Sequence, residues 1–202
     1  MRWFLFFTNL PLGGGFLISI SMTLSKYEQT IAYSRIYGLY VALCWLTGFY
    51  FFVLRLTLDS VVCFACFLLT PVLLYGFAKR FRETRSGGVL TFGQALLLIF
   101  MTCAHASLLT AVGVWVYFSF LDAGSFVSLM ETSLNALDTE IFEKAYGMPK
   151  TEAMQMVSAF SELRPIDITF GYLLDSLFAS VFVSVVVALF VKKTGGPDGY
   201  AV

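Results

Sequence analysis

Charge is scarce in this sequence. Only 13% of its 202 residues are Asp, Glu, Lys or Arg, against about 25% in soluble domains, and 58% are hydrophobic. A soluble domain of this length cannot bury so much apolar surface, which excludes that class of protein. The 13 basic residues balance the 13 acidic ones, so no net field attracts nucleic acid or acidic substrates.

Catalytic and metal-binding residue sets are also missing. Histidine occurs once, and no cysteine lies in residues 122–167. Gly87 and Gly88 lack the lysine and the hydroxyl residue of a phosphate-binding loop. With no nucleophile, metal set or cofactor motif, we expect a non-enzymatic protein without a metal or a cofactor.

Four long apolar windows dominate the chain instead. A helix that crosses about 30 Å of hydrocarbon needs about 20 apolar residues. The windows 36–54, 60–78, 95–121 and 168–191 reach that length, and Asp175 is the one charge within them. The sequence predicts an all-α membrane protein with four transmembrane helices in an antiparallel bundle, over residues 34–193.

The connections between the windows predict the orientation, because cytoplasmic loops retain Lys and Arg. One placement puts eight basic residues inside and leaves four outside. The eight are Lys26, Arg35, Lys79, Arg80, Arg82, Arg85, Lys192 and Lys193. The segment 122–167 has eight acidic and three basic residues, which suits the extracytoplasmic side. Both ends of the core are then cytoplasmic, as is the tail 194–202.

Two apolar stripes at helical spacing lie within 122–167. The first consists of Phe126, Met130, Leu134, Leu137 and Ile141, and the second of Met154, Val157, Phe160 and Leu163. Gly147 and Pro149 separate them, so the sequence predicts two short helices. Their apolar faces either cover the bundle mouth, rest on the membrane or dock a partner.

Residues 1–33 form a separate N-terminal extension. Its first 25 residues resemble a signal peptide, but cleavage conflicts with a cytoplasmic Lys26 and Arg35. A fifth span is allowed by the count of crossings, yet Pro11 and the glycines at 13–15 make it a poor helix. A third hypothesis is that translation begins at Met22.

The stretch RSGGVLTFGQAL at 85–96 resembles a motif in a Bacteroidota family of small four-span membrane proteins catalogued only as a domain of unknown function. The segments IYGLYVAL at 36–43, GMPKTEAMQMVSAF at 147–160 and LFVKK at 189–193 agree with it in order and spacing. The motif residues are Gly87, Gly88, Thr91, Phe92, Gly93 and Gln94.

The resemblance implies a protein of the bacterial inner (cytoplasmic) membrane and supplies no catalytic residues. Members of that family are often encoded near polyprenyl-phosphate sugar transferases, which implies such an enzyme as a partner in envelope glycan assembly. The N-terminal extension and Asp175 depart from the family pattern.

His105 and Asp175 are the ionisable imidazole and acid within the predicted spans, and such groups are functional candidates because hydrocarbon disfavours charge. A His105–Asp175 contact would relay a proton or join two helices. Alternatively, Asp175 faces a wet outer vestibule or pairs with Arg55 or Arg164, and His105 is a neutral packing residue. Interhelical polar contacts contribute only modestly to stability, which favours the second interpretation.

Cys63 and Cys66 form a CxxC near the outer end of the second span. Four-helix membrane thiol oxidoreductases that reduce quinones have such a pair there. They also need a second pair in an outer loop, whereas Cys44 and Cys103 lie within other spans. Packing thiols are therefore favoured over redox chemistry.

The basic cluster Lys79, Arg80, Arg82 and Arg85 is a candidate contact for anionic lipid or a lipid phosphate, although topogenic anchoring explains it equally well. The following Gly87 and Gly88 predict a tight turn, and Thr91 predicts a cap for the third helix.

Small residues recur on two spans, at Ser176, Ser180, Ser184 and Ala188 and at Cys103, Ser107 and Ala111. Helices in lipid associate by close backbone approach, so these stripes predict packing of the third span on the fourth. A homodimer or a larger partner would use the same stripes.

The sequence thus favours a non-enzymatic inner-membrane subunit in envelope biogenesis, in contact with membrane lipid and with a membrane protein or a second copy. The alternatives are a small proton-linked carrier that uses Asp175 and His105 and a quinone-linked thiol oxidoreductase that uses Cys63 and Cys66.

If translation begins at Met22, mass spectrometry of the mature protein will find its N-terminal peptide at that residue. Detection of a peptide that covers Trp3 to Ile20 would rule out the later start.

Overall fold

The computed structural model describes residues 14–53 and 59–194. All regular elements in these ranges are helices: α1 (Gly14–Val53), α2 (Asp59–Arg85), α3 (Phe92–Val116), a π-helical turn η2 (Tyr117–Leu121), α4 (Ser125–Ala136), α5 (Thr139–Tyr146), α6 (Lys150–Ser161) and α7 (Pro165–Val191). Four stretches are long and apolar enough to cross a membrane: Tyr27–Val53, Val61–Arg85, Phe92–Leu121 and Pro165–Val191. The predicted all-α protein with four candidate spans is confirmed.

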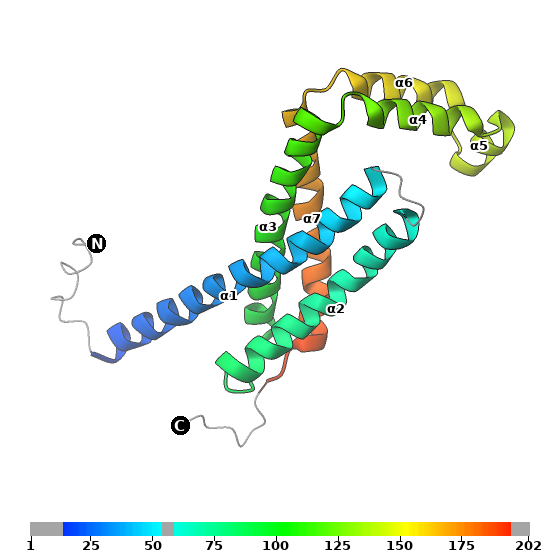
Figure 1. The fold of residues 1–202 in the computed structure, drawn as a ribbon. Helices are drawn as coiled ribbons and strands as arrows, with labels where there is room; N and C mark the ends of the chain where they lie inside the picture. The colour runs from blue at the N-terminus through cyan, green and yellow to red at the C-terminus, as the bar shows by residue number, and fades with distance from the viewer. Residues whose placement is uncertain (1–13, 54–58, 195–202) are drawn as a thin grey trace.

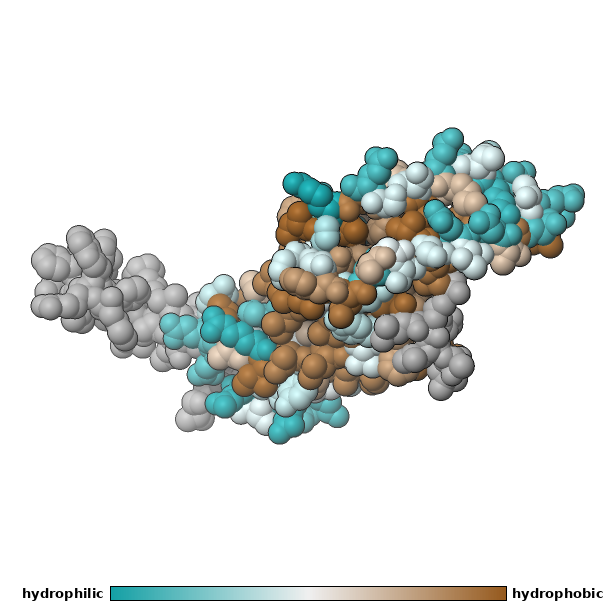
Figure 2. All heavy atoms as spheres, turned by 45° about the horizontal axis from the view of Figure 1, so that its top comes forward, coloured by the Kyte–Doolittle hydropathy of each residue, from teal (hydrophilic) through white to brown (hydrophobic). Residues whose placement is uncertain are grey.

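The helix α3 lies at the centre of the bundle. It runs beside α7 and is crossed near its middle by α1, while α2 lies along α1 (Figure 1). We call the end of the bundle next to α4–α6 the arm end, and the opposite end, where α2 and α7 finish, the basic end. Figure 2 shows an apolar surface over the bundle, with polar side chains gathered on α4–α6 and around the basic end.

Small residues set the distance between α3 and its neighbours. A β-carbon at Gly38 of α1 would lie 2.7 Å from the Cβ of His105 and 2.9 Å from the carbonyl oxygen of Thr102. On the other side of α3, Cys103 and Ser107 are fully buried, as are Ser184 and Ala188 of α7. The predicted packing of the third span on the fourth through small side chains is confirmed.

Aromatic side chains fill the arm end. Val53, Tyr117 and Phe126 are buried there, with Phe49, Tyr50, Phe118 and Phe160 packed around them. Asp122 is also buried, and its carboxylate accepts hydrogen bonds from the amides of Gly124 (3.2 Å) and Phe126 (2.9 Å). These bonds hold the turn between η2 and α4, so the chain leaves α3 in a fixed direction.

The segment α4–α6, which we call the arm, has three helices where two were predicted. The first apolar stripe breaks at Leu137, because the Asp138 carboxylate accepts hydrogen bonds from the amides of Glu140 (2.9 Å) and Ile141 (3.2 Å) and so starts a new helix. The predicted break at Gly147 is confirmed, with a left-handed φ of 68° that suits glycine.

The basic end is closed by backbone hydrogen bonds. Leu90 and Lys193 exchange two N–H to O=C bonds of 2.9 Å, which tie the start of α3 to the end of α7. Gly87 and Gly88 turn the chain with φ values of 59° and 83°. Thr91 and Gln94 form a reciprocal capping box. The predicted turn and cap are both confirmed.

The boundaries of the spans differ from the charge-free windows. The first candidate span includes Arg35, and the second extends to Arg85, because charged side chains at helix ends reach the interface without ending the helix.

At the N-terminal end of the described residues, α1 begins at Gly14, so two of the three glycines expected to disfavour a helix lie within one. Helix propensity is a weak guide where backbone groups need internal hydrogen bonds. Residues 1–13 and 195–202, including most of the tail, lie outside the described ranges, as does Arg55.

Replacing Gly38 with alanine is expected to destabilise the bundle by about 1–3 kcal/mol, because the new methyl group overlaps α3. The expected result is a lower melting temperature in detergent. Gly76→Ala on α2 is the matched control, since no atom lies within 4 Å of the added carbon. Equal melting temperatures for the two variants would contradict the close approach of α1 to α3.

Candidate functional site

A cavity of about 440 Å³ lies between the arm-end halves of α1 and α2 and the middle of α7. Aromatic side chains form much of its wall, small side chains of α3 and α7 form its floor, and its surface is almost wholly apolar. The residues that line it include Trp45, Phe49 and Phe52 of α1, Cys63, Cys66, Phe67 and Pro71 of α2, Cys103 of α3, and Tyr172, Ser176, Ala179 and Ser180 of α7.

The cavity exists because α2 and α7 meet only toward the basic end. There, Leu74 and Ala78 share a buried cluster with Val187 and Val191. A guanidinium N–H of Arg82 also donates a 2.8 Å hydrogen bond to the carbonyl oxygen of Val191. Farther toward the arm end the cavity lies between α2 and α7, and three of the five α7 residues that line it have small side chains, namely Ser176, Ala179 and Ser180.

One polar network lies in the cavity wall. The indole N–H of Trp45 donates to the Thr70 hydroxyl oxygen at 2.9 Å, and that hydroxyl donates to the carbonyl oxygen of Cys66 at 2.9 Å. These bonds join α1 to α2 and use the hydrogen-bonding groups of both side chains. The Trp45 ring therefore meets the cavity as an apolar surface.

The four cysteines come together around this cavity. Cys63, Cys66 and Cys103 line it, and the Cys44 thiol lies 3.9 Å from the carbonyl oxygen of Cys66. The sequence placed Cys44 and Cys103 within other spans and did not predict that they lie near Cys63 and Cys66. The position of Cys44 was predictable, because Cys44 and Cys66 lie at similar separations in sequence from the α1–α2 connection. Two packed helices joined by a short connection bring such positions side by side. In the described ranges, no group of three or more His, Cys, Asp or Glu side chains is placed to bind a metal ion.

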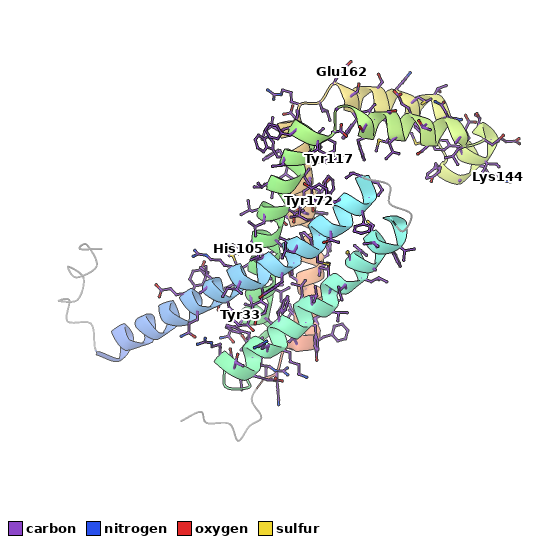
Figure 3. The ribbon with its side chains drawn as sticks, in the orientation of Figure 1. Tyr33, His105, Tyr117, Lys144, Glu162 and Tyr172 are labelled. Carbon is purple, nitrogen blue, oxygen red and sulfur yellow. The ribbon has the colours of Figure 1, made fainter. Side chains whose placement is uncertain are left out.

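His105 faces α1. Its Nδ1 lies 2.7 Å from the carbonyl oxygen of Met101, one turn earlier, and 3.4 Å from the hydroxyl of the fully buried Ser34. Because a carbonyl only accepts, Nδ1 donates its hydrogen to Met101. Figure 3 places His105 where α1 crosses α3, whereas Tyr172 of α7 lies nearer the arm end.

Asp175 lies on a different face. It is exposed on α7, away from the stripe that packs on α3, and shares its surface with the exposed Phe178 and Phe182. Within the described ranges, no hydrogen bond or ion pair involves its carboxylate. The structure therefore does not bring His105 and Asp175 together. Arg164 does not reach Asp175 either, because its guanidinium binds the Asp167 carboxylate at 2.8 and 2.9 Å.

The basic cluster divides into two groups. Lys79, Arg80 and Arg85 are exposed at the end of α2. Arg82 is instead largely buried, since it binds the end of α7 and lies 3.6 Å from Glu83. The residues Gly87, Gly88, Thr91, Phe92, Gly93 and Gln94 of the family-like motif form the adjoining turn and the first turn of α3. The motif thus shapes the basic end and lies far from the cavity.

A family model described as "Protein of unknown function (DUF4199)" matches residues 36–193. The matched range covers all of the second, third and fourth candidate spans and most of the first. No curated protein and no solved structure matches the chain.

Proposed function

This chain belongs to the DUF4199 family of proteins of unknown function, and on that premise we propose that it is a non-enzymatic membrane subunit that binds another membrane protein through α7. The contact surface is the face of α7 that carries Asp175, Phe178 and Phe182.

The exposed carboxylate of Asp175 is the observation that supports this proposal. Asp175 lies ten positions after Pro165, where α7 begins, which is roughly 15 Å along the helix axis. That depth is within the hydrocarbon of a membrane about 30 Å thick. Ionisable groups at such depths almost always face a protein interior or a water-filled cavity. Residues 14–53 and 59–194 cover Asp175 with neither, which supports a second protein as its cover.

The partner's chemistry follows from the carboxylate. A transmembrane helix with a Lys, Arg or hydrogen-bond donor at the matching depth would neutralise or solvate Asp175. A second copy of this chain fits less well. In a two-fold dimer across this face, two Asp175 side chains would meet near the axis, and like charges at short range disfavour each other.

The arm offers a second contact surface. Its base covers the bundle through Phe126 and Phe160, whereas α5 packs on α6 and projects away from the bundle (Figure 1). Ile141 and Tyr146 at this tip are each 67% exposed. The acidic segment 122–167 therefore both caps its own bundle and presents apolar side chains to a partner.

The arrangement lends no support to the two alternative functions. A proton-linked carrier requires communication between His105 and Asp175, which lie on different faces of different helices. A quinone-linked thiol oxidoreductase requires a route from Cys63 and Cys66 to a soluble partner, and the arm has no cysteine to provide one.

We place the protein in the bacterial inner membrane, with both ends of its core cytoplasmic. The lysine and arginine residues of the basic end support this orientation. A partner that acts on polyprenyl-linked sugars in envelope biogenesis is the one that the family resemblance suggests.

Replacing Asp175 with leucine is expected to abolish recovery of the partner in affinity purification from mild detergent, with membrane abundance unchanged. Val181→Leu, on another exposed part of α7, is the matched control and retains the partner. A photo-reactive residue at Phe178, which is 69% exposed on the proposed contact face, is expected to cross-link to a transmembrane peptide of that partner, identified by mass spectrometry.

Recovery of the protein alone at every expression level would overturn the subunit proposal. A cross-linked product of twice the chain's mass would reassign the α7 face to a homodimer.

Single-cysteine variants test the orientation in a background where the four native cysteines are replaced by serine. Thr151→Cys, exposed on the arm, is expected to react with a membrane-impermeant maleimide in intact cells. Thr84→Cys, exposed at the basic end, is expected to react only after the membrane is permeabilised. The opposite pattern would invert the proposed topology.

A further inference from the structure

We infer that the cavity between α1, α2 and α7 is a binding site for one acyl chain of a membrane phospholipid. The inference is independent of the partner proposed for Asp175, since that carboxylate does not line the cavity.

The depth of the cavity determines what surrounds it. It is lined along α7 from Tyr172 to Val183, within the candidate span Pro165–Val191. At this depth the medium is hydrocarbon, and the lining has few polar groups that could hold water. Trp45 and Thr70 already satisfy each other. Lipid is therefore the occupant that both the medium and the lining favour.

The length of the cavity suits one acyl chain. Val183 lies eleven positions after Tyr172 on α7, which corresponds to roughly 16 Å at 1.5 Å per residue. Half of a hydrocarbon core about 30 Å thick is about 15 Å, so the cavity is about as long as one leaflet is deep. Because the lining spans the middle of α7, an acyl chain that enters from the arm end would extend past the midplane.

The size of the cavity suits a small ligand. Its volume of about 440 Å³ falls in the range of about 300–1,000 Å³ that is typical of small-molecule sites.

The floor of the cavity distinguishes this site from ordinary lipid contact with a helix surface. Cys103 is fully buried between helices and Ser180 nearly so, yet both line the cavity. A chain in this space reaches the packed centre of the bundle. Its path from the membrane lies between α2 and α7, which meet only toward the basic end.

Fluorescence of Trp45 tests the site in the full-length protein. Trp3→Phe and Trp115→Phe leave Trp45 as the one tryptophan. In nanodiscs of phosphatidylglycerol with bromine atoms midway along the acyl chains, Trp45 emission is expected to be lost relative to unbrominated nanodiscs. Bromine quenches indole only near contact.

Ala179→Phe fills the cavity from α7 and is expected to restore most of the lost emission. Val181→Phe adds the same ring to an exposed position outside the cavity and is expected to leave the quenching unchanged. Native mass spectrometry provides a second measurement that does not depend on fluorescence. The unsubstituted chain is expected to retain one phospholipid, and Ala179→Phe to lose it.

Absence of quenching in the single-tryptophan protein would overturn the inference, as would equal quenching in Ala179→Phe and Val181→Phe. Should Ala179→Phe fail to fold, retention of no phospholipid by the unsubstituted chain would overturn it on its own. Recovery of Trp45 emission on adding unbrominated C55 polyprenyl phosphate at a small fraction of the phospholipid would overturn the acyl assignment in favour of an isoprenoid lipid.

Discussion

The close contact of α3 with both α1 and α7 is the constraint on which the rest of the structure depends. Lipid tails are as apolar as leucine, so helices in a membrane associate by dispersion and close backbone approach. Gly38 meets one side of α3, and Ser184 with Ala188 meets another. With those two faces of α3 occupied, α2 lies along α1 and reaches α7 only at the basic end. The cavity is the space that this arrangement leaves.

His105 and Asp175, the imidazole and the acid within the four apolar windows, differ in their surroundings. His105 is held by the Met101 carbonyl and lies beside Ser34, so its polarity is satisfied within the chain and stabilises the α1–α3 crossing. Asp175 faces away from the bundle with no partner in the described ranges. Hydropathy alone treats the two as equivalent interruptions of an apolar run. Only the direction in which each points distinguishes His105, an internal packing group, from Asp175, an exposed group that the proposed partner would cover.

Sequence predicted the features that depend on local chemistry. The four candidate spans follow from length and apolarity, and the turn at Gly87 and Gly88 and the cap at Thr91 follow from backbone preferences. The packing of α3 on α7 was predictable from small residues at four-residue spacing. The face that each span turns toward the bundle was not predictable, because lipid-facing and bundle-facing positions are both apolar. In α7, Phe, Val and Leu occur on several sides of the helix. The convergence of four cysteines and the cavity itself depend on the direction of α2, which no local pattern specifies. The break at Asp138 was missed because an apolar stripe continues across it.

The cavity and the arm are physically connected through α1. Phe49 and Phe52 line the cavity, and the same two rings contact the arm end, with Phe52 beside Phe126 and Phe49 beside Tyr117 at centroid distances of 6.3 and 5.5 Å. Packed aromatic rings have few alternative arrangements, because interiors are close-packed and transmit displacement. An acyl chain in the cavity would therefore contact the same aromatic rings against which the arm packs. A protein that displaced the arm would in turn displace these rings in the cavity wall. Coupling of this kind is reciprocal in free energy, so lipid in the bundle and a partner on the arm would each change the affinity for the other.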